Sequence, residues 1–298
     1  MIDILKNCNL CPRNCGVDRT KEVGACGASD KLKVAYYSLH EWEEPVISGS
    51  NGSGTIFFSH CNLKCIYCQN KKISTSGYGK EISTERFREI CLELQDKGAH
   101  NINLVTPTHY VPIIAEELHK IEGKELNIPI VYNTSSYENI HTLMMMRGIV
   151  DIYLADLKYF DDKLAKKYSK VDNYFETATL AIDEMYRQVG NPEFDKNGIM
   201  TKGLIVRVLI LPGHTEDAKK IIKYLYATFG NYIFISIMNQ YTPIINSKRY
   251  PNLNRKITDE EYDDVIKYAL SIGVENAFIQ EGETQSESFI PKFDKSIL

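Results

Sequence analysis

From residue 55 onward, apolar stretches of strand length alternate with segments of helical periodicity. Several of these stretches are apolar on both faces, as parallel strands covered by helices are. Between them, apolar residues recur at the i, i+3, i+4, i+7 spacing of a helix face, for example from Phe87 to Leu94. The predicted strands are 55–60, 101–106, 128–133, 151–158, 204–211 and 232–238, and a short strand-like stretch, VENAFIQ, ends the series. The other predicted helices are 110–122, 137–147, 161–189 in two pieces, 215–229 and 259–272.

Repeated strand–helix units predict a parallel sheet with right-handed crossovers. Six units suit an incomplete α/β barrel better than a closed barrel of eight, and reactive residues of such barrels lie at the carboxyl ends of the strands. We therefore predict a partial (β/α)6 TIM-like barrel over residues 55–298, preceded by a small appendage over residues 1–54. Two further stretches, 190–203 and 241–257, are expected to be loops. The second either covers the barrel mouth or is a surface excursion.

Composition narrows the classes of partner. The 298 residues include 43% hydrophobic and 25% charged residues, and the net charge is −4. This balance suits a large core and gives no strong attraction to nucleic acid. No apolar run is long enough to span a membrane, and the start, MIDILKNCNLCPRNC, lacks the basic and apolar regions of an export signal. Cysteines clustered as metal ligands need a reducing compartment, so we expect a cytoplasmic protein without nucleic-acid or membrane partners.

Three cysteines follow the first predicted strand at metal-ligand spacing. Cys61, Cys65 and Cys68 form a C-x3-C-x2-C run in TIFFSHCNLKCIYCQN. A structural zinc normally takes four protein ligands, and a purely electron-carrying four-iron cluster normally takes four cysteines. Three thiolates therefore predict a cluster with one open iron, which binds something besides protein.

A second group of cysteines lies in the appendage. Cys8, Cys11, Cys15 and Cys26 occur within CNLCPRNCGVDRTKEVGAC, which is rich in turn residues. Four thiols make a complete S4 site. Structural zinc and an auxiliary [4Fe-4S] cluster are equally compatible with this pattern, and a disulfide pair or free thiols form a third alternative.

Charged residues end two of the apolar strands. Alternation along DIYLADLKYF places Asp156 and Lys158 on one face. Burying both is costly unless they pair with each other or bind a polar ligand. Arg207 in LIVRVLILPGHTED either clamps a ligand carboxylate, for which its planar fork is suited, or is the buried partner of Asp156 or Glu281.

Hydrogen-bonding side chains end the other strands. Thr106 and Thr108 follow the second strand, Asn133 to Ser135 end the third, and Asn239 to Tyr241 end the sixth. Any one of them is more often a turn or cap residue, but as a ring they predict the lining of one pocket. His109 is either a proton donor or a histidine without a reactive role at the start of a helix.

With Tyr67 just before the last cysteine, the C-x3-C-x2-C run resembles the radical S-adenosylmethionine (radical SAM) enzymes. In that family the open iron chelates the methionine moiety of SAM, and an electron from the cluster cleaves SAM to a 5′-deoxyadenosyl radical that takes hydrogen from a substrate. The resemblance implies a catalytic [4Fe-4S] cluster on Cys61, Cys65 and Cys68, and a reductant of the flavodoxin or ferredoxin type. It implies a SAM site lined by Tyr67, Thr106, Thr108, Asn133, Asp156, Lys158 and Arg207. At the second strand the chain departs from the family, which usually has a Gly-Gly-Glu-Pro type run.

Three further runs resemble a subgroup that is similar to pyruvate formate-lyase activating enzymes. These runs are C-x-L-C-P-R-x-C-G near the start, then Y-C-Q-N, and later Q-Y-T-P. The resemblance implies an oxidoreductase acting on a glycine of a glycyl-radical partner enzyme, or on a different peptide or small molecule. Activating enzymes with extra clusters insert them after the cysteine motif, whereas residues 69–83 contain no cysteine. The rival interpretation is a non-catalytic iron–sulfur or zinc scaffold or electron carrier.

Overall fold

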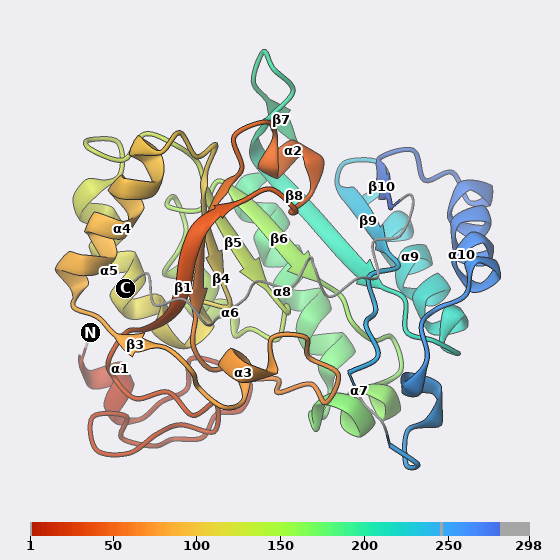
Figure 1. Cartoon of the computed structure of the whole chain (residues 1–298), viewed down its shortest axis with the longest axis horizontal. Helices are drawn as coiled ribbons and strands as arrows, with labels where there is room; N and C mark the ends of the chain where they lie inside the picture. Colours follow the sequence, from red (N-terminus) through yellow and green to blue (C-terminus); the bar gives the residue numbers. More distant parts are fainter. Residues whose placement is uncertain (1, 245–246, 281–298) are drawn as a thin grey trace.

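A mainly parallel sheet organises the chain, which the computed structural model describes at residues 2–244 and 247–280. The strand order is β10-β9-β8-β6-β5-β4-β2-β1-β3, and the strands from β2 to β10 along this path are parallel neighbours. Within the described ranges the path ends at β10 and β3, so the sheet is an open partial barrel (Figure 1). The parallel strands are β2 (Ser53–Phe58), β4 (Ile102–Val105), β5 (Ile130–Thr134), β6 (Ile152–Asp156), β8 (Met200–Leu209), β9 (Phe234–Met238) and β10 (Ala277–Ile279). The predicted fold class is confirmed, because each predicted strand and the strand-like end occur in this sheet.

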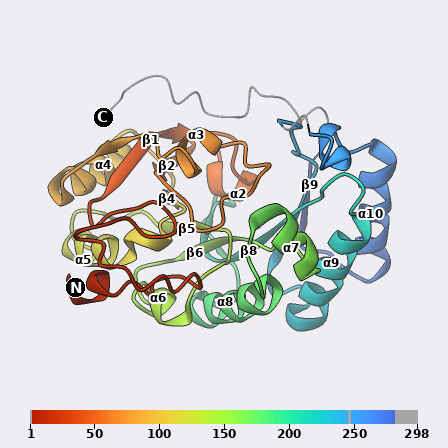
Figure 2. The ribbon, with the colours of Figure 1, turned by 90° about the horizontal axis from the view of Figure 1, so that it is seen from below.

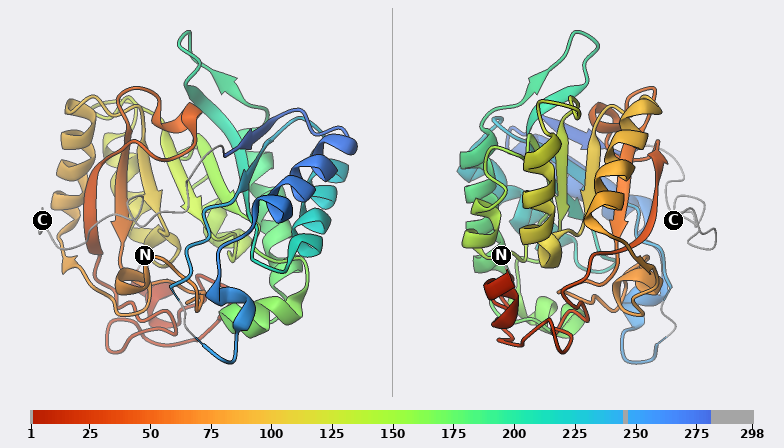
Figure 3. Two further views of the ribbon diagram at one scale, coloured as in Figure 1. Left: turned by 45° about the vertical axis from the view of Figure 1, so that its right-hand side comes forward. Right: turned by 90° about the vertical axis from the view of Figure 1, so that its left-hand side faces the viewer.

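Helices cover the outer face of the sheet, as two further views show (Figure 3). They are α4 (Thr84–Asp96), α5 (Val111–Ile121), α6 (Ile140–Met144), α7 (Asp162–Ser169), α8 (Tyr174–Val189), α9 (Thr215–Phe229) and α10 (Asp259–Ser271). The segment expected as two helical pieces divides where Lys170 and Asn173 adopt φ of 53° and 52°. This left-handed backbone cannot continue an α-helix. None of the helices in the described residues has the length and apolarity needed to cross a membrane.

Three short antiparallel strands complete the sheet. They are β1 (Lys33–His40), β3 (Lys80–Glu81) and β7 (Glu193–Phe194). β1 pairs with β2, so a strand from the range 1–54 belongs to the same sheet as the barrel. The predicted loop 190–203 is a hairpin, because β7 pairs with the first residues of β8.

Among the described residues, helix α2 (Pro45–Ser48) covers one end of the inner face of the sheet. It packs Ile47 against Val131, Ile152, Leu154 and neighbouring apolar residues of β8. This packing closes the end of the inner face from which the parallel strands begin, and it leaves room toward their carboxyl ends. The remaining short helices are α1 (Ile2–Lys6), α3 (Lys71–Ser74), η1 (Thr108–Tyr110) and η2 (Pro251–Asn254).

Candidate active site

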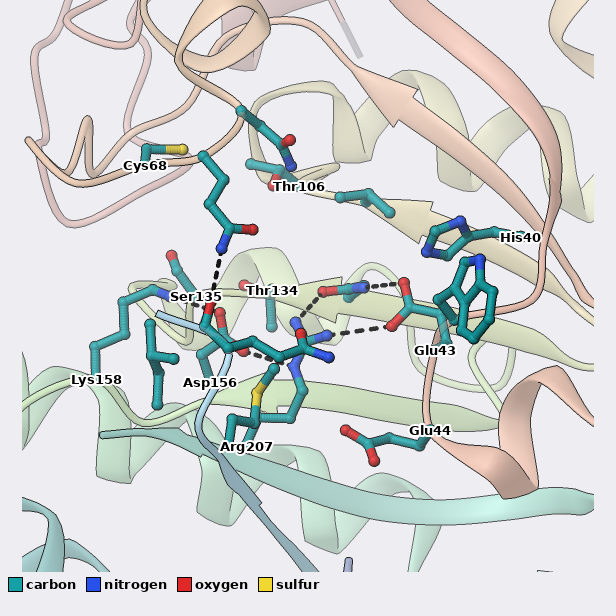
Figure 4. Close-up of a pocket in the computed structure, with 18 of the residues that line it drawn as sticks. His40, Glu43, Glu44, Cys68, Thr106, Thr134, Ser135, Asp156, Lys158 and Arg207 are labelled. Carbon is teal, nitrogen blue, oxygen red and sulfur yellow. Dashed lines mark hydrogen bonds and ion pairs between the residues drawn. The ribbon is translucent and has the colours of Figure 1, made fainter. Parts of the chain in front are cut away.

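A cavity of about 1250 Å³ lies on the inner face of the sheet. Its walls come from the cysteine loop after β2, the carboxyl ends of β4, β5, β6, β8 and β9, and the segment between β1 and α2 (Figure 4). The cavity lies where a partial α/β barrel carries its reactive groups. It has room for a ligand larger than a typical small metabolite, since common ligand pockets measure about 300–1000 Å³.

The loop with Cys61, Cys65 and Cys68 turns sharply at His60 and Lys64, whose φ values are 77° and 54°. All three cysteines line the cavity. Ser169 donates a hydrogen bond to the sulfur of Cys65 at 2.9 Å, and Ser74 donates one to that of Cys68 at 3.3 Å. The Ser74 hydroxyl favours the thiolate form of Cys68, which a metal requires.

The thiols also affect one another. Burial raises the pKa of the Cys61 thiol to about 12, and the proximity of Cys65 and Cys68 adds to that rise. Three neighbouring thiolates that are buried or partly buried need a positive counter-charge, which bound iron would supply. Among the described residues, no three His, Cys, Asp or Glu side chains already stand in a metal-binding arrangement. The donors fit a cluster in type and placement, and the cysteine side chains would have to turn toward one another to hold it.

Asp156 is the centre of a charged network in the cavity wall. Arg207 Nε and Lys158 Nζ each lie 2.7 Å from a different oxygen of its carboxylate. Burial opposes ionisation of Asp156, but Arg207 and then Lys158 bring the pKa of its carboxyl below the ordinary value. The internal ion pair considered from the sequence thus forms, and its members also face the cavity. Arg207 is the buried partner of Asp156; its other considered partner, Glu281, lies outside the described residues.

Lys158 lies between this network and the cysteine loop (Figure 4). Burial opposes its charge, yet Asp156 and then Cys65 hold the pKa of the ammonium above its ordinary value. In the same way, burial raises the pKa of the Cys68 thiol, whereas Ser74 and Lys158 lower it. The charge of Lys158 therefore interacts both with the Asp156 carboxylate and with the cysteines of the loop.

The other residues expected around SAM differ in their placement. Tyr67, Thr106 and Asn133 line the cavity. The Tyr67 hydroxyl lies 2.7 Å from that of Tyr159, and Asn133 Oδ1 accepts a hydrogen bond from Arg207 at 2.7 Å. Thr108 is not among the lining residues, because its hydroxyl donates to Glu138 at 2.6 Å.

His109 is buried, and its Nε2 lies 2.8 Å from the carbonyl oxygen of Ser59. Burial, and after it the charge of Arg19, lowers the pKa of His109 to about 3, so it is neutral at physiological pH. This environment fits the non-reactive role considered from the sequence. Further along the chain, Gln240 and Tyr241 line the cavity, and Gln69 donates to the Gln240 carbonyl at 2.7 Å. This bond ties the segment after β9 to the cysteine loop.

Sequence reasoning missed the segment between β1 and α2. The cavity is also lined by His40, Trp42, Glu43 and Glu44. Figure 4 shows His40, Glu43 and Glu44 at the side of the cavity away from Cys68. Glu43 accepts hydrogen bonds from Asn103 at 3.1 Å and from Arg207 at 3.2 Å. The available signal was the pair of adjacent carboxylates in HEWEEP, directly before a helix whose Ile47 is apolar.

The N-terminal segment that carries Cys8, Cys11, Cys15 and Cys26 lies beneath the carboxyl ends of the parallel strands (Figure 2). Burial raises the pKa of the Cys26 thiol, and the proximity of Cys8 and Cys15 adds to that rise. A methyl group at Gly24 would lie 3.4 Å from the sulfur of Cys26 and 3.6 Å from that of Cys15, so these two sulfurs approach the same point. Arg19 is 1% exposed, and its guanidinium lies 4.0 Å from the sulfur of Cys8. It also donates to the carbonyls of Ser29 and His109.

Arg13 connects this segment to the cysteine loop. Its guanidinium donates to the carbonyl of Asn62 at 2.9 Å and to that of Lys170 at 2.8 Å. A second contact brings the two segments together at Gly27, where a methyl group would meet the His60 ring at 2.9 Å. The two groups of cysteines are therefore neighbours in space.

A scan against protein families matches residues 55–225 to the radical SAM superfamily. This match covers more than half of the chain, and the chain belongs to that superfamily. Uncharacterized protein MJ0674 of Methanocaldococcus jannaschii is 31% identical over 281 residues, which cover 90% of this chain and 75% of that protein.

Two solved structures match this chain at low sequence identity. SuiB of Streptococcus suis, bound to its precursor peptide SuiA, is 14% identical with a TM-score of 0.50, and the match covers 75% of this chain and 47% of SuiB. Methylornithine synthase (PylB) is 14% identical with a TM-score of 0.45, over 70% of this chain and 59% of that enzyme. The chain thus spans about half the length of these structures. Membership of the superfamily implies a [4Fe-4S] cluster, SAM and a source of electrons.

Proposed function

We propose that this protein is a radical SAM oxidoreductase that holds its cluster on Cys61, Cys65 and Cys68 and binds SAM in the 1250 Å³ cavity. The observation that carries the proposal is that the three thiols and the network of Asp156 and Lys158 face the same cavity. When bound, the cluster supplies the electron that cleaves SAM to a 5′-deoxyadenosyl radical, which removes a hydrogen atom from the substrate.

The chain's own residues bind and orient SAM in this proposal. The Lys158 ammonium uses one donor on Asp156 and has further donors for the carboxylate of SAM. Asp156 is held in place by Arg207 and accepts hydrogen bonds from a ribose or an amino group. Tyr67, Thr106 and Asn133 complete the lining. Thr108 acts indirectly, by fixing the turn after β4 through Glu138.

We assign a metal to Cys8, Cys11, Cys15 and Cys26 in the N-terminal segment. Arg19 supports this assignment because its hydrogen bonds reach carbonyl oxygens and a thiol, while burial of a guanidinium is costly without a negative partner. Metal-bound thiolates supply that negative charge. Zinc and an auxiliary [4Fe-4S] cluster both meet this requirement, and metal analysis distinguishes them.

The substrate is, in this proposal, a glycine of a glycyl-radical partner enzyme, or else another peptide or a small molecule. The three runs that resemble the activating-enzyme-like subgroup favour a macromolecular substrate. A reductant of the flavodoxin or ferredoxin type would supply the electrons.

Anaerobic reconstitution with iron and sulfide tests the proposal. We expect dithionite-dependent conversion of SAM to 5′-deoxyadenosine, and a cluster EPR signal that changes when SAM is added. Cys65→Ala should abolish both signals, whereas Cys91→Ala, at a buried cysteine of α4 outside both motifs, should keep them. A reconstituted cluster whose spectrum does not respond to SAM would refute the proposal.

A further inference from the structure

The cavity has two chemically different sides. Cys68 and Lys158 lie at one side, and His40, Glu43 and Glu44 lie at the other (Figure 4). Trp42 belongs to the same segment as the glutamates and also lines the cavity. If SAM occupies the side near the cysteines, the side formed by the segment 40–44 is available to the substrate.

The charges that line the cavity do not balance. The lining includes two cations, Lys158 and Arg207, and four carboxylates, of Glu41, Glu43, Glu44 and Asp156. Both cations pair with Asp156 at 2.7 Å, and Arg207 also pairs with Glu43 at 3.2 Å. In the described part of the chain, Glu44 has no ion pair within 4.0 Å, although it is only 7% exposed.

Burial makes the surplus charge of Glu44 costly. It raises the pKa of the Glu44 carboxyl, and Glu43 and Asp156 raise it further, against the opposing effects of Ser236 and Arg207. A ligand cation beside Glu44 would offset this cost, because an opposite charge favours the ionised form of a buried carboxyl. The carboxylate is thus suited to a cationic partner that residues 2–244 and 247–280 do not supply.

The segment holds this carboxylate in a fixed place. The Ser48 hydroxyl accepts a hydrogen bond from the Glu43 amide at 3.0 Å and donates one to the His40 carbonyl at 3.3 Å. Ile47 anchors α2 in the apolar inner face of the sheet. The indole of Trp42, which is 59% exposed, offers an aromatic surface to a cation in the same cavity.

We propose that the substrate carries a positively charged group, an ammonium or a guanidinium, that binds Glu44 at the side of the cavity opposite the cysteines. The inference rests on the proposed function in placing SAM near Lys158. A lysine or arginine side chain of a peptide and a small amine or guanidine share this chemistry.

The test uses the anaerobically reconstituted full chain and isothermal titration calorimetry, with and without saturating SAM. The probes are N-acetyl-arginine amide, its neutral isostere N-acetyl-citrulline amide, and butylguanidine, which has no peptide groups. We expect the arginine probe to bind about 30-fold or more tightly than the citrulline probe, as is typical when a buried charge pair is lost. If the arginine probe binds more tightly than butylguanidine, the source of the cation is a peptide. If the two probes bind equally, the source is a small molecule.

Glu44→Gln keeps the shape of the side chain and should reduce this discrimination to within about 3-fold. Glu125→Gln is the matched control, because Glu125 is exposed in the turn after α5. Trp42→Ala, at an exposed position, is a second variant that should weaken binding of both cationic probes without affecting the fold.

Equal binding of the charged and neutral probes would overturn the inference, and so would competitive displacement of the arginine probe by SAM. Neither result depends on turnover. Formation of 5′-deoxyadenosine without probe discrimination would refute only the inference, whereas discrimination without SAM cleavage would refute only the proposed function.

Discussion

Lys158→Ala separates a SAM-binding role from a structural one. The ammonium is 2.7 Å from Asp156, and the side chain is 17% exposed. Removing one member of a buried ion pair costs about 3–5 kcal/mol when it leaves a charge unpaired. Here Arg207 still holds the other oxygen of Asp156 at 2.7 Å, so we expect a smaller loss of stability, about 1–2 kcal/mol.

The effect on SAM should be larger than the effect on folding. Loss of a charged contact to the SAM carboxylate in a buried site costs about 2 kcal/mol or more, which corresponds to at least about 30-fold in affinity. Titration calorimetry of SAM into the reconstituted protein measures this change, and iron analysis measures the cluster. Lys158→Met, which keeps most of the side-chain volume, should behave like Lys158→Ala.

Lys163→Met is the control, because Lys163 is exposed on α7. Unchanged SAM affinity in Lys158→Ala with full iron content would refute a contact between Lys158 and SAM. Loss of the cluster or of folding would instead assign Lys158 a structural role.

Three further predictions concern stability and metal content. Burial raises the pKa of the Glu138 carboxyl to about 7, so the contribution of this group to the free energy of unfolding is fully present below pH 4.5 and is lost as the pH rises through 7, by up to about 3 kcal/mol. Urea unfolding between these pH values should show a weaker pH dependence of stability in Glu138→Gln. An unchanged pH dependence in this variant would contradict the raised pKa of Glu138. Arg13→Ala should lower the free energy of unfolding by about 2–3 kcal/mol, because the hydrogen bonds of Arg13 to the carbonyls of Asn62 and Lys170 are lost. Arg187→Ala is the control and should change the free energy of unfolding little, since the ion pairs of Arg187 stay within α8. Cys11→Ser should remove the N-terminal metal in mass-spectrometric metal analysis and keep the EPR signal of the cluster on Cys61, Cys65 and Cys68; unchanged metal content would exclude Cys11 as a ligand.

The parallel strands and their helices were predictable because their signals are local. Strands such as β6 and β8 are apolar on both faces, and α4 shows a clear helical stripe. The pairing of β1 with β2 was not predictable in this way, since it depends on hydrogen bonds between strands and not on periodicity. The prediction from the sequence therefore assigned the strand that begins at Lys33 to the appendage over residues 1–54.

The site was predictable where ligands follow one another along a single segment. The spacing of Cys61, Cys65 and Cys68 is visible in the sequence, and so is the alternation that places Asp156 with Lys158. Thr108 shows the limit of this reasoning, because the backbone turns at Thr106, with φ of 58°, and continues into a short helix that sends Thr108 to Glu138.

Groups that reach the site from distant segments carry no such signal. The Ser169 hydroxyl meets Cys65 across 104 positions of sequence, and the Glu43 carboxylate meets Arg207 across 164. Their positions follow from the packing of α2 against the sheet and from the path of the chain after α7. Only folding brings each of these pairs together.

The hydrogen bond between Arg13 and Asn62 couples the two segments that carry the clustered cysteines. Arg13 lies between Cys11 and Cys15, and the carbonyl that it holds belongs to the residue directly after Cys61. If oxidation of the N-terminal thiols rearranged this segment, the Arg13 hydrogen bond would break, and the backbone at Asn62 would lose one of its fixed partners. The mobility of the loop after β2 would then report on the redox state of cysteines that belong to a different segment.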